Sequence, residues 1–292
     1  MPGQLTRAAI AAQPDWLRQV PERVGGKRLP DGARMLFTGC GTSYHAALAS
    51  GAPAAQALEL VLGTAPAADV LVALSHEGGT RLTTEAVEAF DGETWLVTGA
   101  ADSPLAQIVD HVVVAAPEVE ESYCHTASYT TAIAACRALL GEDVSGLAET
   151  VGRELAAAPF PVSDHDRFLV AGAGRDACTV QEAVLKLREG VHVAAEAHHT
   201  EQLLHGHLAA VDSAVRCFVL EGEGRASERA REAVAALEEL RCDAALVPTS
   251  HPVVDIVRFQ RLTADLAGAR GIDPDRIRLD EEPWARARKA YA

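Results

Sequence analysis

The sequence lacks the features of membrane, disulfide-rich and zinc-binding proteins. No segment of its 292 residues approaches the roughly 18 uninterrupted apolar residues of a membrane-spanning helix. Its start, MPGQLTRAAIAAQPDW, has no continuous apolar stretch of the kind that a signal peptide contains. No two of the six cysteines form a CxxC pair, which indicates reduced thiols in a cytoplasmic protein and argues against a disulfide framework or a zinc knuckle.

Positive charge is also scarce. The chain has 26 Lys and Arg against 41 Asp and Glu, which gives a formal net charge of -15. We therefore expect no nucleic acid and no anionic membrane as a partner, because both would repel the chain. A small anionic ligand stays open, since a binding site responds to the groups beside it. What the chain does have is 48% hydrophobic and 23% charged residues, proportions typical of a globular protein.

Short apolar runs alternate with helical patterns along most of the chain. The runs are nearly continuous, which is typical of strands buried on both faces of a parallel sheet. Helical patterns are predicted at residues 44–60, 81–90 and 127–140, and again after each glycine turn of the second half. The strand-like runs are ARMLFTG, DVLVALS, TWLVTGA and HVVVAAP in the first half, and RFLVAG, AVRCFVL and DAALVPT in the second.

The order strand, glycine turn, helix occurs twice. FTGCGTS at 37–43 corresponds to VAGAGRD at 170–176, and ALSHEGGT at 73–80 corresponds loosely to VLEGEGR at 219–225. We therefore predict an α/β protein of two halves, each a doubly wound parallel sheet with helices on both faces. The predicted division is a lead-in helix over 1–33, a first domain over 34–158, and a second domain with the C-terminal tail over 159–292.

The first glycine turn, GCGTS, has two interpretations. Glycines allow close approach of a ligand, and the N–H groups at the start of a helix favour an anion. A tight strand-to-helix turn with a capping hydroxyl would have the same sequence. Neither turn has the third glycine of a dinucleotide-binding fingerprint, which argues against a Rossmann dehydrogenase.

Four stretches together resemble the sugar isomerase (SIS) family. SIS domains occur in tandem in the isomerase half of glucosamine-6-phosphate synthase and in fructosamine-phosphate deglycases. The resemblance implies two SIS-type halves, a sugar or sugar phosphate as ligand, no cofactor, and a homodimer with shared active sites. The four stretches are GCGTSYHA at 39–46, SHEGGT at 75–80, EAVLKLREGVHVAAEAHHTEQLLHGHLAAVD at 182–212, and AAQPDWL at 11–17.

The amidotransferases of this family carry an N-terminal glutaminase domain, whose nucleophilic cysteine lies next to the initiator methionine. Here Pro2 follows Met1, and no segment is left for such a domain. We therefore expect no glutamine amidotransferase activity from this chain acting alone.

The second half contains the candidate catalytic residues. Glu182, Lys186 and Glu189 are spaced i, i+4, i+7 and so share one helical face, as an ordinary salt-bridge ladder also would. By the resemblance, Glu189 moves a proton between C1 and C2 of an open-chain sugar, Lys186 tunes it, and Glu182 holds sugar hydroxyls or orients Lys186. The resemblance also makes His205 the residue that assists ring opening, reaching into the neighbouring subunit; an ordinary loop histidine is the alternative.

The first half contains the candidate ligand-binding residues. By the resemblance, the hydroxyls of Ser43, Ser75 and Thr80 hold a phosphate. Glu77 departs from the family, because a serine usually stands there; it could turn away, bind a bridging cation, or bind a hydroxyl of an unphosphorylated or amino sugar. The full predicted set is Cys40, Gly41, Thr42, Ser43, Ser75, His76, Glu77, Thr80 and His125.

Other departures affect the choice of function. Ala127 stands where the family usually has a lysine, His207 replaces a usual proline, and Lys289 lies too far along the tail to align with the family's C-terminal lysine. The histidines have no HExxH helix pattern, so no metal site is expected. The leading hypothesis is an aldose–ketose isomerase or deglycase acting through an enediol or enolamine. The alternatives are a non-catalytic sugar-phosphate sensor and an enzyme of amino-sugar metabolism.

Overall fold

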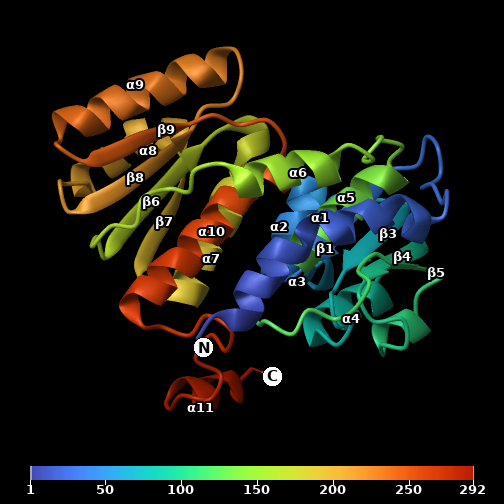
Figure 1. Cartoon of the computed structure of the whole chain (residues 1–292). Helices are drawn as coiled ribbons and strands as arrows, with labels where there is room; N and C mark the ends of the chain where they lie inside the picture. Colours follow the sequence, from blue (N-terminus) through green and yellow to red (C-terminus); the bar gives the residue numbers. More distant parts are fainter. Residues whose placement is uncertain (1, 292) are drawn as a thin grey trace. The chain divides into compact units, whose positions relative to one another are not determined.

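A computed structural model describes residues 2–291 and contains two compact units (Figure 1). The N-terminal unit comprises Gln4–Ala156 with residues 275–291, and the C-terminal unit comprises Ala157–Pro274 with residues 2–3. The sequence division placed the whole tail with 159–274, whereas residues 275–291 group with the N-terminal unit. The reason is Asp275, whose carboxylate accepts hydrogen bonds from the N–H groups of Leu5 and Thr6 at the start of helix α1, Gln4–Val24.

The N-terminal unit is built on a parallel sheet of five strands. In the order of the sheet these are β2 (Ala54–Gln56), β1 (Met35–Gly39), β3 (Val70–Leu74), β4 (Glu93–Thr98) and β5 (His111–Val114). Leu36, Leu71 and Leu96 pack on one face with α3 (Ala57–Val61) and α4 (Arg81–Glu88). The alternate strand residues face the other side, where α2 (Thr42–Ala49) and α5 (Ala127–Leu139) contact the sheet. Helices α1 and α6 (Leu147–Ala156) pack against each other, and α1 also packs against α5.

The C-terminal unit has a parallel sheet of four strands. Their order is β7 (Ala194–His199), β6 (Arg167–Gly172), β8 (Val215–Leu220) and β9 (Asp243–Val247). Leu169 and Cys217 face α8 (Thr200–Leu204) and α9 (Arg225–Glu239). On the other face the rings of Phe218 and Phe259 lie 5.5 Å apart, which places α10 (Pro252–Arg270) there beside α7 (Ala177–Val191; Figure 1). The prediction of parallel sheets flanked by helices is confirmed. Short elements complete the chain: η1 (Leu105–Gln107), η2 (Gly174–Asp176), η3 (His207–Ala210) and α11 (Trp284–Arg288).

Two local predictions were wrong or incomplete. Residues 44–60 form α2, β2 and α3 rather than one helix, because Gly51 takes a positive φ of 86° and Pro53 cannot donate to a continuing helix. The edge strand β7 was not predicted, because its sequence AAEAHH lacks a continuous apolar run. Among the helices of residues 2–291, none is long and apolar enough to cross a membrane.

Candidate functional site

The first glycine turn brings the start of α2 close to the carboxyl end of β1. Gly41 has φ 56° and ψ −129°, a conformation that favours glycine. At Gly39 an added Cβ would lie 2.9 Å from the Cβ of Ser43, so the turn tolerates no side chain without moving the helix. Thr42 and Ser43 therefore stand at the first turn of α2, and both line a pocket in the N-terminal unit.

The second predicted loop, Ser75–Thr80, contributes only part of its side chains to this pocket. Ser75 lines the pocket, and its Oγ lies 3.3 Å from Oγ1 of Thr80. Thr80 itself is exposed and is not among the lining residues. Glu77 is likewise exposed and does not line the pocket. Of the three arrangements considered for Glu77, this exposed position favours the one in which the carboxylate turns away.

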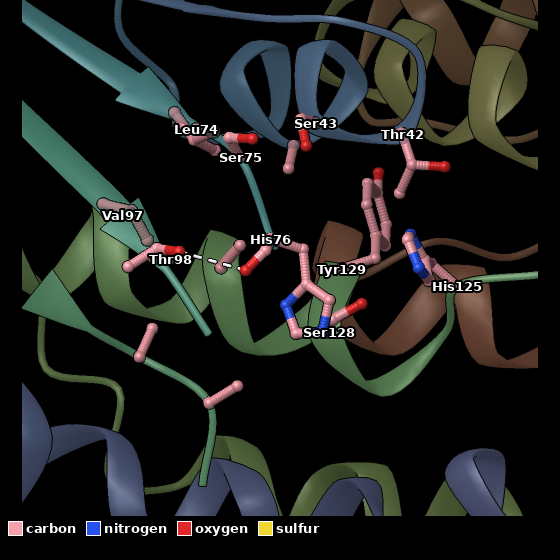
Figure 2. A pocket seen from close by; sticks show the side chains of 14 residues that line it. Thr42, Ser43, Leu74, Ser75, His76, Val97, Thr98, His125, Ser128 and Tyr129 are labelled. Atoms are coloured by element: carbon pink, nitrogen blue, oxygen red, sulfur yellow. Dashed lines mark hydrogen bonds between the residues drawn. The ribbon is translucent and has the colours of Figure 1, made fainter. Parts of the chain in front are cut away.

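Figure 2 shows the pocket, which lies at the carboxyl ends of β3 and β4 and beside α5. His76 lies near its centre, with Ser43 and Ser75 on one side and His125 and Tyr129 on another. Four of the nine predicted ligand residues, Cys40, Gly41, Glu77 and Thr80, do not line it. The fourteen lining residues are Thr42, Ser43, Ala46, Leu74, Ser75, His76, Val97, Thr98, Ala115, Ala116, His125, Ser128, Tyr129 and Ala132.

Glu120 holds the two histidines in place, and sequence reasoning missed it. Its backbone N–H donates to Nε2 of His76 at 2.7 Å. Its buried carboxylate accepts from the N–H groups of Thr126 and Ser128 at the start of α5, both at 2.8 Å. The carboxylate thus caps α5 directly after His125, whose ring lies 5.3 Å from that of His76. Its sequence gave no distinct signal, because Glu120 is one of three closely spaced glutamates, Glu118, Glu120 and Glu121, before α5.

In the C-terminal unit, α7 brings together three of the four predicted catalytic residues. Nζ of Lys186 lies 2.7 Å from Oε2 of Glu189 and 3.3 Å from Oε1 of Glu182. The side chains of Lys186 and Glu182 are fully buried, while that of Glu189 is 24% exposed. This burial excludes a solvated salt-bridge ladder. Lys186 is fixed between two carboxylates, and only that of Glu189 keeps exposed surface with which it can contact a ligand.

The predicted ring-opening residue, His205, lies at the end of α8. Its side chain is 74% exposed, and its Nε2 lies 3.2 Å from Oε2 of Glu201. Arg229 also binds Glu201, which anchors the carboxylate behind the imidazole. The exposed imidazole can therefore meet a ligand or another subunit.

The neighbouring histidines have structural contacts. Nδ1 of His199 accepts from the N–H of Glu201 and caps α8. The rings of His198 and His207 lie 4.4 Å apart, and Nε2 of His198 lies 3.0 Å from Glu196. Within residues 2–291, no group of three or more His, Cys, Asp or Glu side chains is arranged to hold a metal ion.

The glycine turns of the C-terminal unit lie near a pair of buried carboxylates. Asp176 accepts from Oγ1 of Thr249 at 3.1 Å, and Asp255 accepts from the N–H and hydroxyl of Ser250. Burial raises the pKa of both groups, and the charge of Asp176 adds to the effect at Asp255, whose pKa reaches about 6. Asp176 stands where the first turn has Ser43, so this turn offers a carboxylate in place of a hydroxyl.

We expect the Asp255→Asn variant to gain stability over wild type as the pH rises. A folded-state pKa raised from 3.8 to about 6 contributes stability that is present below pH 3.8 and lost as the pH rises through 6. Asn has no such loss and can still accept from Ser250. In urea unfolding, the free energy of unfolding of the variant minus that of wild type should increase by about 2 kcal/mol between pH 4.5 and pH 7.5. The exposed Asp164→Asn change is the control, and an equal difference at both pH values would contradict this prediction.

Comparisons with known proteins are consistent with this architecture. No family model matches the chain. The chain is 26% identical to the glutamine–fructose-6-phosphate aminotransferase (isomerizing) of Methanothermobacter thermautotrophicus, over 83% of this chain and 50% of that protein. The chain thus spans about half the length of the curated relatives it matches.

Two crystal structures have the same fold over nearly their whole length. One is the tagatose-6-phosphate ketose/aldose isomerase of Escherichia coli, with a TM-score of 0.80 and 18% identity, covering 97% of this chain and 99% of that one. The other is the glucosamine-6-phosphate deaminase of Thermotoga maritima, with a TM-score of 0.73 and 21% identity, covering 94% and 97%. The chain therefore has the SIS-type fold of these phosphosugar enzymes.

Proposed function

We propose that the protein is a sugar-phosphate isomerase or deglycase. The observation that carries the proposal is the buried Lys186 fixed between Glu182 and Glu189, in a chain with the fold of phosphosugar enzymes. Burying a lysine and a glutamate costs free energy unless they are paired. A protein that only bound a sugar would not need this arrangement.

Glu189 is the proposed base. It takes the proton from C2 of an open-chain aldose, the C–H electron pair forms the C1–C2 double bond, and the C1 carbonyl oxygen takes up a proton to give the enediol. The proton on Glu189 then returns to C1 while the C2 hydroxyl gives up its proton and becomes the carbonyl of the ketose, so that the net changes are H from C2 to C1 and a proton from O2 to O1. Lys186 holds the carboxylate at 2.7 Å and so fixes its orientation. Glu182, fully buried behind Lys186, is the positioning residue. His205 is the proposed acid and base for opening the sugar ring, a role that imidazole can fill near neutral pH.

The N-terminal pocket is the proposed binding site for the phosphate. Ser43 and Ser75 offer hydroxyl donors beside the start of α2, whose N–H groups favour an anion. The two units support a tandem duplication, since β2-β1-β3-β4 and β7-β6-β8-β9 follow the same order relative to the chain. In each unit the Gly-x-Gly turn follows the unit's first strand along the chain, which is β1 in the N-terminal unit and β6 in the C-terminal unit.

The test is turnover of fructose 6-phosphate, tagatose 6-phosphate and glucosamine 6-phosphate in D2O, followed by NMR. While Glu189 holds the proton, that proton can exchange with D2O. A proton shuttle through Glu189 should therefore place deuterium at C1 or C2 of the sugar. With glucosamine 6-phosphate, the same proton transfer gives a fructosylamine tautomer, and hydrolysis of its C–N bond by water should release ammonia and leave fructose 6-phosphate. Binding of these compounds without turnover or exchange would replace the proposal with the sensor alternative.

The sensor alternative is supported by two residues. Ala127 is fully buried at the first position of α5 and offers no charge to a phosphate. Glu77 stands where the SIS resemblance implies a serine, so the loop lacks that hydroxyl. Both are losses at positions where the SIS resemblance implies polar ligand groups.

We expect the Glu77→Ser variant to bind fructose 6-phosphate with an affinity within about threefold of wild type, because an exposed carboxylate outside the pocket is well screened. The Ser43→Ala variant is the contrast, since a lost hydrogen bond to a charged group costs a factor of about 10 or more. Isothermal titration calorimetry measures both. A gain of more than tenfold in Glu77→Ser would mean that this carboxylate faces the ligand.

We also propose a homodimer in which His205 completes the active site of the neighbouring subunit. Mixed subunits of the His205→Ala and Glu189→Gln variants should recover about one quarter of the wild-type activity, because half of the dimers are mixed and each has one intact site. The variants are unfolded together, refolded and assayed. No recovery above the separate variants would show that His205 serves its own subunit.

A further inference from the structure

The pocket of the N-terminal unit has no fixed positive charge. Its fourteen lining residues include no Lys or Arg, and also no Asp or Glu. The hydroxyls of Ser43 and Ser75 can donate hydrogen bonds to an anion but cannot neutralise it. Two side chains in the pocket can become cationic at moderate pH, His76 and His125.

His76 is held in its neutral form. Its Nε2 already accepts a hydrogen bond from the N–H of Glu120 at 2.7 Å, so a proton added at Nε2 would face another donor. Burial and, after it, the charge of His125 together lower the pKa of His76 to about 4, although the Glu120 carboxylate opposes both. His76 therefore stays neutral over the physiological range.

His125 is the other imidazole of the pair. It is half-buried, it lines the pocket directly before α5, and its ring lies edge-on to that of His76 at 5.3 Å. Among the ionisable groups near it are His76, Tyr129 and Glu120. Glu120 directs its carboxylate at the N–H groups of Thr126 and Ser128, so much of its charge is already compensated by α5.

We propose that binding of a dianion in this pocket is coupled to the uptake of one proton by His125, with His76 remaining neutral. The inference rests on the proposed phosphate recognition by the same pocket. An anion beside His125 favours the imidazolium, and by linkage the imidazolium favours the anion. Affinity then rises by up to about tenfold for each unit by which the pH falls, as long as free His125 is mostly unprotonated.

The probe is sulfate, which keeps two negative charges throughout the range, so that any proton taken up goes to the protein. Sulfate affinity is measured by NMR titration of the full chain at several pH values between about 5.5 and 8. Wild type should bind more tightly as the pH falls, and the imidazole resonances of His125 should shift to a higher apparent pKa in sulfate. A pH-independent sulfate affinity, or no sulfate binding at about pH 6, overturns the proposal.

Three variants assign the proton. His125→Gln should bind sulfate with little dependence on pH. His76→Gln should retain the dependence, because His76 takes up no proton, and loss of the dependence in that variant would overturn the assignment to His125. His111→Gln is the matched control, since this exposed histidine on β5 pairs with Glu93 and does not line the pocket.

The outcomes separate this inference from the proposed function. Proton-coupled sulfate binding without turnover of any sugar phosphate would leave the inference standing and remove the isomerase. Turnover of sugar phosphates with pH-independent sulfate binding would do the reverse.

Discussion

The Glu189→Gln variant is expected to lose about 10²–10⁴-fold in kcat, the contribution that a positioned general base makes. Gln keeps the size of the side chain and can still accept a hydrogen bond from Lys186, but it cannot take a proton. Stability should change little, because Glu189 is partly exposed, at 24% of its side chain. The assay is ketose–aldose conversion together with deuterium incorporation at C1 and C2.

The control is Glu201→Gln, which changes a carboxylate beside His205 rather than the proposed base. It leaves the Lys186 cluster intact, so deuterium exchange into an open-chain substrate should persist even if ring opening slows. If Glu189→Gln still exchanges at the wild-type rate, the proton shuttle uses another group and the assignment of Glu189 is wrong.

The sequence was informative where the chemistry is local. The spacing of Glu182, Lys186 and Glu189 predicted a shared helical face, and the structure joins Lys186 to both carboxylates. The continuous apolar runs predicted β1, β3, β4 and β5, because strands buried on both faces need no polar alternation. Strands β2 and β7 were not predicted, because β2 has only three residues and the sequence of β7, AAEAHH, is polar.

The sequence was least informative about contacts between distant segments. The hydrogen bond from Glu120 to His76 joins residues 44 positions apart, and no periodic pattern encodes it. Tyr129 and Ser128 entered the pocket because α5 begins where the Glu120 cap sets it. For Glu77 the sequence identified the residue but did not predict its surroundings. Its position in the loop indicated a departure from the SIS pattern, but only the backbone conformation showed that its side chain is exposed.

The Lys186→Met variant is expected to destabilise the protein by about 3–5 kcal/mol, the usual cost of removing one partner of a buried ion pair. The Lys186 and Glu182 side chains have no exposed surface, so Glu182 would keep a buried charge without the ammonium 3.3 Å away. Met has a similar volume and fills the space. The measurement is the free energy of unfolding from urea titration at pH 7.5, with activity assayed on the same samples.

The double variant Glu182→Gln/Lys186→Met separates the two roles of the cluster. Removing both charges leaves no buried carboxylate without a partner at position 182. We therefore expect the double variant to recover most of the stability lost in Lys186→Met. Activity should stay low, because Glu189 loses the ammonium at 2.7 Å that orients it. A stable, fully active double variant would show that the buried pair is a packing feature and that Glu189 needs no fixed partner. A double variant as unstable as the single one would show that Lys186 stabilises the fold through its contact with Glu189, and that the pairing with Glu182 contributes little.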